Sequence, residues 1–220
     1  MTDTETFLGI MTICVVLVTL NYFTIKEMLS DTIILKSKFN LFSVLLIKGK
    51  IIYPEENYVQ VTEGKFSRKS FFLIKGKKTY SSGLIEEGKF GESLQMKLIK
   101  GKATYPDGTV KEGIFDEDTG FLIKGKITYS DGRIEEGIFE VFMKLIKGKI
   151  TFPDGRIEEG IFDKDTTFLI EGKIRYPEGD VEEGTFDKDT DYLIEGKITY
   201  PDGRIEEGKF DKDTGKLIEE

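Results

Sequence analysis

The stretch LIEGKITYPDGRIEEGKFDKDTGK, residues 193–216, is the best preserved copy of a phrase that recurs seven times from Leu46 onward. The first glycine of each copy follows the previous one by 23 to 27 residues, and a second glycine comes twelve residues later in every copy but the first. A fixed period of this size is typical of stacked-repeat proteins. In such proteins each unit contacts only its neighbours, and the array offers a long surface instead of a pocket.

Each copy contains two strand-like halves around a turn. In the last copy these halves are residues 193–200 and 204–210, and Pro-Asp-Gly joins them. Proline suits the first central position of a type I turn, Asp the second, and Gly the left-handed position of a three-residue hairpin loop with a bulge. The turn residues that this pattern predicts are Asp107, Gly108, Asp131, Gly132, Asp154, Gly155, Asp202 and Gly203.

The three-residue loop also predicts a strand register. It places Lys197 opposite Glu207 and Glu195 opposite Lys209, so that opposite charges face each other across the strands. Each such pair contributes about 0.2–1 kcal/mol. A two-residue loop would instead place Lys197 opposite Gly208 and remove this pairing, so we predict the three-residue register.

On the other face the same register pairs Ile194 with Phe210 and sets two glycines opposite each other. Glycine within a strand often marks the close approach of another group. We predict that aromatics of the adjoining copy, such as Tyr176 or Phe186, lie over this bare backbone and form a continuous spine. The structural repeat glycines are Gly101, Gly113, Gly125, Gly137, Gly148, Gly160, Gly172, Gly184, Gly196 and Gly208.

These patterns predict an all-β fold, an elongated single-sheet array of about seven stacked antiparallel β-hairpins preceded by one N-terminal helix. The array takes residues 46–220. Residues 28–45 are predicted to form a connector that caps the array, and residues 1–27 an anchor helix. The first copy lacks the glycine turn, as terminal repeats often do when they cap a stack.

Residues 7–25 form an apolar run of 19 residues without a charge. A helix of this length crosses a hydrocarbon core of about 30 Å. A cleavable signal peptide fits poorly, because Asp3 and Glu5 stand where a basic segment belongs. The predicted membrane anchor includes Phe7, Ile10, Val15, Leu17, Leu20 and Tyr22. The alternative is a buried apolar helix or strand that covers the end of the stack.

The charges that flank the apolar run predict its orientation. Lys26, Lys36 and Lys38 follow the run, and no Lys or Arg precedes it. Positive residues are enriched on the cytoplasmic side of membrane spans. We therefore expect a single-pass protein with its repeats on the cytoplasmic side.

Composition excludes several classes of function. The chain has no His and one Cys, Cys14, so Ser-His-Asp triads, His-containing metal sites, cysteine clusters and internal disulfides are excluded. The net charge of −8 argues against a nucleic-acid partner. We predict no catalytic residue, no cofactor, no metal site and no small-molecule substrate.

Two acidic motifs have residue types that could support chemistry. The linkers, such as Asp163-Lys164-Asp165-Thr166, have the D-x-D spacing that begins a calcium loop, but they lack the later ligands. The alternative is an Asp-capped turn, which we favour. Glutamate pairs such as Glu158-Glu159 recur in the strands, but successive strand residues point to opposite faces and cannot flank one bond. An enzyme is therefore not expected.

Lysines and glutamates also form columns through the copies. One lysine column, Lys50 to Lys197, faces a glutamate column, Glu63 to Glu207. A second column is Lys in five copies, Lys48 to Lys147, and Glu in the last two. One hypothesis is that these lysines meet anionic lipid headgroups. The alternative, which we favour, is a solvated face with cross-strand ion pairs.

The GKxTYPDGxxEEGxF core resembles the membrane occupation and recognition nexus (MORN) repeat, especially its degenerate variant in bacterial antitoxin-like proteins. The resemblance covers about four-fifths of the chain. Two positions depart from the usual pattern: Ile194 replaces the first glycine of a GxG start, and Glu206 replaces a common aromatic. The resemblance implies a scaffold at membranes, cytoskeletal structures or cilia. Such arrays are also numerous in large DNA viruses.

We therefore expect a non-enzymatic structural protein, a membrane-tethered β-repeat rod that serves as a docking element in a large complex. Its expected partners are proteins of that assembly, and membrane lipid through the N-terminal helix. A minor virion protein that links a capsid to an internal membrane is one such setting. The alternatives are a lipid-binding module at anionic membranes and an antitoxin-like inhibitor of one protein partner.

Overall fold

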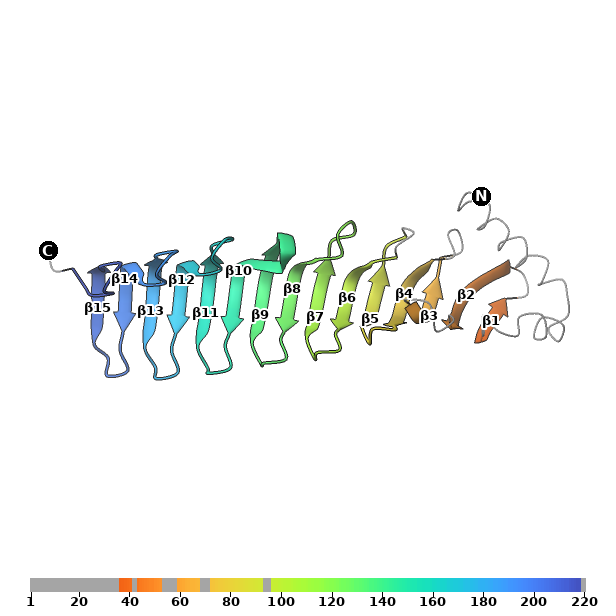
Figure 1. Cartoon of the computed structure of the whole chain (residues 1–220), viewed down its shortest axis with the longest axis horizontal. Helices are drawn as coiled ribbons and strands as arrows, with labels where there is room; N and C mark the ends of the chain where they lie inside the picture. The colour runs from red at the N-terminus through yellow and green to blue at the C-terminus, as the bar shows by residue number, and fades with distance from the viewer. Residues whose placement is uncertain (1–35, 41–42, 53–58, 68–71, 93–95, 219–220) are drawn as a thin grey trace. The chain divides into compact units, whose positions relative to one another are not determined.

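The computed structural model describes residues 36–40, 43–52, 59–67, 72–92 and 96–218 (Figure 1). The predicted anchor helix at residues 1–27 lies outside the described residues, with Phe7 and the other anchor positions. The chain divides into two compact units, Met1–Lys97 and Leu98–Glu220. Every strand pair that the structure describes within either unit is antiparallel, which confirms the all-β prediction.

The first unit contains two repeat hairpins and one further strand. Its strands are β1 (Lys36–Asn40), β2 (Ser43–Ile52), β3 (Val59–Phe66), β4 (Leu73–Tyr80) and β5 (Ile85–Phe90). Each strand pairs with the next along the chain. The repeat pattern did not predict β1, because its sequence, KSKFN, shows no glycine period.

The second unit contains five hairpins whose strands follow one another in chain order (Figure 1). Its strands are β6 (Leu98–Thr104), β7 (Val110–Phe115), β8 (Leu122–Thr128), β9 (Ile134–Glu140), β10 (Lys144–Thr151), β11 (Ile157–Phe162), β12 (Leu169–Arg175), β13 (Val181–Phe186), β14 (Leu193–Thr199) and β15 (Ile205–Lys209). A short 3₁₀ turn, η1 (Val141–Met143), separates β9 from β10. Hairpin turns line one edge of this unit and linkers line the other. At about 4.8 Å per strand, ten strands extend over roughly 43 Å.

The hairpin turns have the three-residue geometry that Asp-Gly favours. In the β8–β9 turn the Tyr129 amide donates to the Arg133 carbonyl at 2.9 Å, and the Gly132 amide donates to the Tyr129 carbonyl at 3.1 Å. Gly132 has a φ of +92°, and the Asp131 carboxylate accepts the Arg133 amide at 2.9 Å. The turns at Asp107, Asp154 and Asp202 repeat these contacts.

The predicted register is confirmed in β14 and β15. Lys197 faces Glu207, Glu195 faces Lys209, and the two glycines face each other. The same register recurs in the other four hairpins of the second unit, where the Lys–Glu and Gly–Gly pairs are kept but the second charge pair is not. The loop and the charge pattern therefore specify one register between them.

The predicted pairing of Ile194 with Phe210 is confirmed in the backbone, where the Phe210 amide donates to the Ile194 carbonyl at 2.9 Å, but Ile194 is only half-buried. The register shifts between β13 and β14, where Phe186 faces Leu193 and Thr185 faces Glu195, so Ile194 is the extra residue of a β-bulge. Leu193 is 4% exposed and Phe186 is 2% exposed, and these two residues reach the core. A bulge moves the facing side chain by one residue, and alternation alone does not reveal it.

The core is formed by phenylalanines and leucines that recur in each repeat, one on each of two successive strands. Fully burying one such side chain contributes about 1.5–3 kcal/mol. The core phenylalanines, all at most 5% exposed, are Phe66, Phe90, Phe115, Phe139, Phe162, Phe186 and Phe210. The core leucines, all at most 4% exposed, are Leu73, Leu98, Leu122, Leu145, Leu169 and Leu193.

The facing glycines allow neighbouring hairpins to approach backbone to backbone. A Cβ added to Gly113 would overlap the carbonyl oxygen of Lys124 and lie 2.8 Å from the Cα of Gly125. Gly113 also has a φ of +152°, which side chains rarely adopt. The closest neighbours are therefore backbone atoms of the next hairpin, in place of the aromatic rings that the sequence suggested.

Candidate interaction surfaces

One face of the second unit carries a row of alternating charges, called here the paired row. Lys102 faces a glutamate on β7, and every other lysine of the row faces a glutamate on each of its two neighbouring strands. Lys173 Nζ lies 2.7 Å from Glu183 Oε2, and this hydrogen bond lowers the pKa of Glu183. The members are Lys102, Glu112, Lys126, Glu136, Lys149, Glu159, Lys173, Glu183, Lys197 and Glu207. Such exposed pairs balance charge and contribute little stability.

A second row on the same face, the lysine–isoleucine row, has no such balance. Lys100 faces Ile114, Lys124 lies between Ile114 and Ile138, and the alternation continues strand by strand. The row comprises Lys100, Ile114, Lys124, Ile138, Lys147 and Ile161. Its isoleucines are 37% to 43% exposed. Sequence reasoning found the lysine column but missed that isoleucine, not glutamate, faces it.

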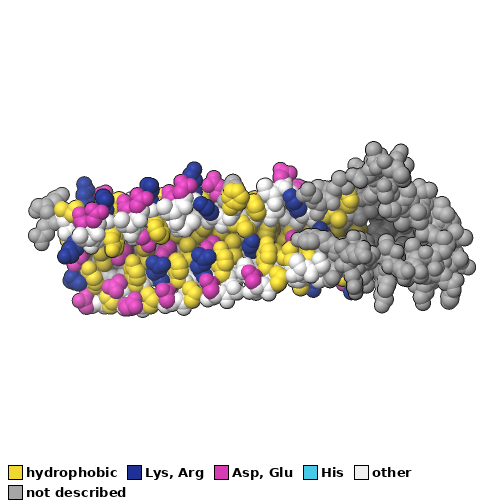
Figure 2. All heavy atoms as spheres, in the orientation of Figure 1, with side chains coloured by type: hydrophobic (Ala, Val, Ile, Leu, Met, Phe, Trp, Pro, Cys, Tyr) yellow, Lys and Arg dark blue, Asp and Glu magenta, His cyan; other side chains and the backbone are white. Residues whose placement is uncertain are grey.

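In the space-filling view, charged side chains of both signs and apolar side chains share the visible surface of the second unit (Figure 2). After Ile161 the second row changes character. Glu171 faces Thr185, and Glu195 lies between Thr185 and Lys209. The alternation of lysine with isoleucine is therefore confined, within this unit, to strands β6 to β11.

On the opposite face, tyrosine, arginine and glutamate side chains form compact sets near the hairpin turns. Arg133 lies 4.1 Å from the centroid of the Tyr129 ring and 3.2 Å from Glu135. The Tyr129 hydroxyl donates to Glu135 at 3.1 Å. Burial raises the pKa of Glu135, and burial and the Glu135 carboxylate raise the pKa of Tyr129 to about 12. These groups pair with one another, with the exception of Arg133 Nε, which is buried without a hydrogen-bond partner.

Glu158 is the most perturbed carboxyl of these sets. It is 4% exposed and lies 3.2 Å from Arg156. Burial raises the pKa of Glu158 to about 7, Arg156 opposes this rise, and Asp191 and Asp154 add to it. Its sequence neighbour Glu159 is exposed on the other face, as predicted, so the two carboxyls do not flank one bond.

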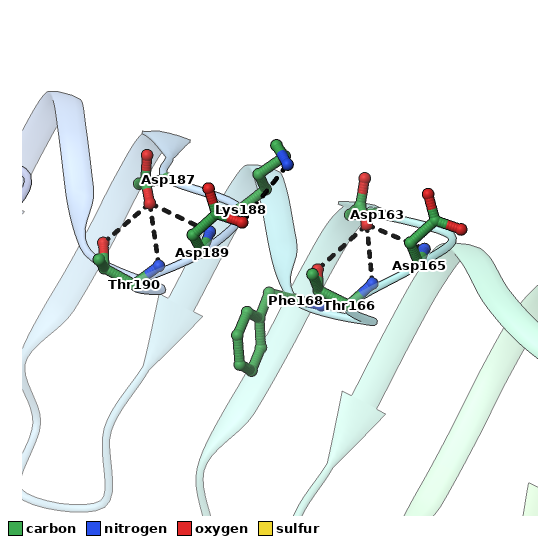
Figure 3. Close-up of polar contacts among 8 residues, drawn as sticks. All are labelled: Asp163, Asp165, Thr166, Phe168, Asp187, Lys188, Asp189 and Thr190. Atoms are coloured by element: carbon green, nitrogen blue, oxygen red, sulfur yellow. Dashed lines mark hydrogen bonds and ion pairs between the residues drawn. The ribbon is translucent and has the colours of Figure 1, made fainter.

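The linkers are closed by aspartates (Figure 3). Asp163 Oδ1 accepts the amide of Asp165 at 2.9 Å, and the amide and hydroxyl of Thr166 at 2.8 and 3.1 Å. These hydrogen bonds, the Thr166 amide first, lower the pKa of Asp163. Asp187 makes the same three contacts. The predicted Asp-capped turn is confirmed, and no cluster of three metal-ligating side chains occurs in the part of the chain that the structure describes.

The linker before β10 lacks this aspartate motif. Phe142 and Met143 both have a φ of +62°, and Phe142 is 73% exposed. The Phe142 ring lies 6.0 Å from Phe121, and Met143 Sδ lies 2.9 Å from Lys111 Nζ. This linker therefore presents an aromatic side chain at the edge where its counterparts present aspartates.

In the first unit a buried lysine takes a position held by isoleucine or alanine elsewhere. Lys78 is 2% exposed, its ammonium donates to the Met96 carbonyl, and it lies 4.6 Å from the Phe90 ring. Burial lowers the pKa of Lys78 to about 8, and Glu86 opposes this fall. The available signal was the lysine at a position where β8 has Ile127. The hydrogen bond from Lys78 therefore attaches strand β4 to Met96, in the linker between β5 and β6.

The first unit also has a like-charged row, called here the lysine row. Lys65 of β3 faces Lys75 of β4, and Lys75 faces Lys89 of β5. The register continues the row through Lys48 of β2 and Lys38 of β1. Beside it this unit has a paired row of its own, with Lys50 Nζ 3.9 Å from Glu63 Oε2 and with members Lys50, Glu63, Lys77 and Glu87.

Comparisons with known proteins leave the family open. No protein-family profile matches the sequence, and no curated protein matches it. A similar solved structure is the SAS-4 (dCPAP) TCP domain of Drosophila melanogaster, in complex with a proline-rich motif of Ana2 (dSTIL). It is 18% identical, has a TM-score of 0.40, and the match covers 80% of this chain and 90% of that chain. In the residues searched, no helix has the length and apolar character that a membrane span needs.

Proposed function

We propose that the protein is a non-enzymatic docking element of a larger assembly, built from MORN-like hairpins. The observation that carries this proposal is the lysine–isoleucine row, where Ile114, Ile138 and Ile161 stand exposed between unbalanced lysines. Apolar side chains grouped on a solvated face mark contact sites. The perturbed Glu135 and Glu158 support a structural role, because each forms an ion pair with the arginine two residues before it in the chain.

The test uses the full chain and a variant in which the three isoleucines become threonine, the residue found at position 185 of the same row. Cross-linking in cells followed by mass spectrometry should identify one dominant protein partner joined to this face. We expect the variant to recover at least fivefold less of it while its circular dichroism is unchanged. Equal recovery by both proteins would contradict the proposal.

We also propose that residues 1–27 tether the array to a membrane with its repeats on the cytoplasmic side. The support is the uncharged run at residues 7–25 and the lysines that follow it. An internal membrane of a virion is one such location. Fractionation of the full chain beside a form lacking residues 1–26 tests the tether: the full chain should sediment with membranes and the shortened form should not. A soluble full chain would refute it.

A further inference from the structure

The lysine row places like charges side by side. Strands lie about 4.8 Å apart, and Lys65, Lys75 and Lys89 occupy directly facing positions on three successive strands. Like charges directly opposite each other destabilise a sheet. The neighbouring paired row avoids this cost by alternating lysine with glutamate, as Glu63, Lys77 and Glu87 do. The lysine row therefore has a charge arrangement that lowers the stability of the sheet.

The last three lysines of the row, Lys65, Lys75 and Lys89, are exposed to solvent. Within the described ranges, none of the three makes an ion pair, whereas Lys50 of the paired row does. A row of exposed, uncompensated ammonium groups is complementary to a linear arrangement of negative charges.

We propose that the lysine row binds an extended acidic peptide of a partner protein. The row is one side chain wide, which favours a single extended peptide over a broad anionic surface. Exposed Glu63 and Glu87 stand two residues from Lys65 and Lys89 on the same strands, about 6.7 Å away. A flat layer of phosphates, or the paired strands of a nucleic acid, would press against these carboxylates. A single extended chain follows the lysines alone.

The distribution of charge along the chain supports this site. Residues 98–220 contain 19 Lys and Arg against 30 Asp and Glu, a net charge of −11. Residues 1–97 contain 13 against 10, a net charge of +3. An acidic peptide is therefore repelled by the second unit and attracted to the first. The inference rests on the proposed docking function, and it specifies that one partner carries an extended acidic segment.

Fluorescence polarisation of the full chain tests the site. The probe is a fluorescein-labelled twelve-residue peptide with Glu at alternate positions, and the matched peptide has Gln in their place. We expect the Glu peptide alone to bind, and to bind several-fold more weakly at 200 mM than at 50 mM salt. The variant K65E/K75E/K89E should bind at least tenfold more weakly. The control K164E/K188E/K212E changes net charge equally and should bind within twofold of the wild type.

A single substitution separates ligand binding from a structural role. Lys75→Glu creates a Lys–Glu–Lys ladder with Lys65 and Lys89, so we expect the melting temperature to rise while peptide affinity falls at least threefold. A residue that served stability alone would not show these opposite changes. A fall in both quantities, or unchanged affinity, overturns the proposal.

Competing ligands give distinct results. Tighter binding of dT12 or of phosphatidylserine vesicles than of the Glu peptide, lost in the triple variant, would overturn the peptide assignment in favour of phosphate. Self-association at low salt that the triple variant abolishes would replace the peptide with a second copy of the chain. If the Glu peptide does not bind but the partner is still cross-linked through the lysine–isoleucine row, only the lysine-row proposal is contradicted, because the two rows share no residue.

Discussion

At the scale of single residues, the linker loops show how one backbone conformation selects its side chains. The fifth residue of each Asp-capped loop is left-handed: Gly120 has a φ of +78°, Thr167 of +67°, Asp191 of +62° and Gly215 of +68°. Glycine adopts this conformation without strain, whereas a β-branched residue does not. Thr167 is therefore the residue of these four that its backbone disfavours most, because Asp tolerates the left-handed region.

This difference predicts that Thr167→Gly stabilises the protein. Removing the strained side chain should raise the free energy of unfolding by roughly 0.5–1 kcal/mol, after the entropy that glycine gains in the unfolded chain is subtracted. Thermal unfolding of the full chain measures the change. The reverse substitution, Gly215→Thr, is the control and should lower the melting temperature. A destabilised Thr167→Gly would show that the threonine methyl group makes a contact that outweighs strain.

Glu158 predicts a pH dependence of stability. Its folded-state pKa of about 7 lies above the ordinary value of 4.5, so folding favours the protonated form. The contribution of Glu158 is full below about pH 4.5 and is lost as the pH rises through 7. The loss is on the order of 3 kcal/mol at most.

We therefore expect the free energy of unfolding to fall less between pH 5 and 8 in Glu158→Gln than in the wild type. Urea titrations at the two pH values measure this difference. Glu159→Gln is the control, because its carboxylate is 58% exposed on the other face. An identical pH slope for the wild type and Glu158→Gln would show that Arg156 keeps Glu158 ionised throughout.

At the scale of elements, the glycine pairs decide how closely hairpins pack. Gly113→Ala would force a methyl group into the backbone of β8 and would strain a φ of +152°. We expect a loss of roughly 2–5 kcal/mol in the free energy of unfolding. Gly203→Ala is the matched control, because it lies at a turn with a φ of +88° and nothing within 4 Å of the added Cβ. It should cost about 1–2 kcal/mol. Equal losses in the free energy of unfolding for the two variants would mean that close backbone contact between hairpins does not determine the cost at Gly113.

The elements of the repeats were predictable because several local signals agree. Asp-Gly turns, the glycine period and the Lys–Glu pairing all specify the same hairpin and register. The β-bulge at Ile194 was not predictable, because the phrase Leu-Ile offers two apolar residues and only the register shows which one is buried. The lysine row was missed for a related reason. Lys65 lies on the second strand of its hairpin, and its neighbour Lys75 belongs to the next hairpin, so this contact becomes visible only when hairpins are set side by side.

The candidate surfaces were predictable only in part. The sequence showed the lysine column from Lys48 to Lys147. It did not show that lysines face this column in the first unit and isoleucines face it in the second. Lys78 and the strained linker at Phe142 each break the repeat, and such breaks are the signal that sequence reasoning should have followed. The membrane anchor stays a prediction, because residues 1–27 lie outside the part of the chain that the structure describes.

At the scale of the molecule, strand pairing within the second unit is confined to strands adjacent in sequence. Stability in such arrays is approximately a sum of repeat and nearest-neighbour terms. Deleting residues 169–192, one full copy of 24 residues, should therefore leave a folded protein whose Asp163 linker joins Leu193. We expect an unchanged far-ultraviolet circular dichroism signal per residue and a lower melting temperature. Loss of cooperative unfolding would show that contacts reach beyond neighbouring copies.

The central claim is that hairpins lie side by side in a register that forms the lysine row. Disulfide formation in a Cys14→Ser background tests it most directly, because Cα atoms must lie within about 7 Å to be bridged. Lys65→Cys with Lys75→Cys should form a disulfide under mild oxidation. Lys65→Cys with Lys89→Cys, two strands apart, should not. Bridging of the second pair but not the first would contradict the register and the surface built on it.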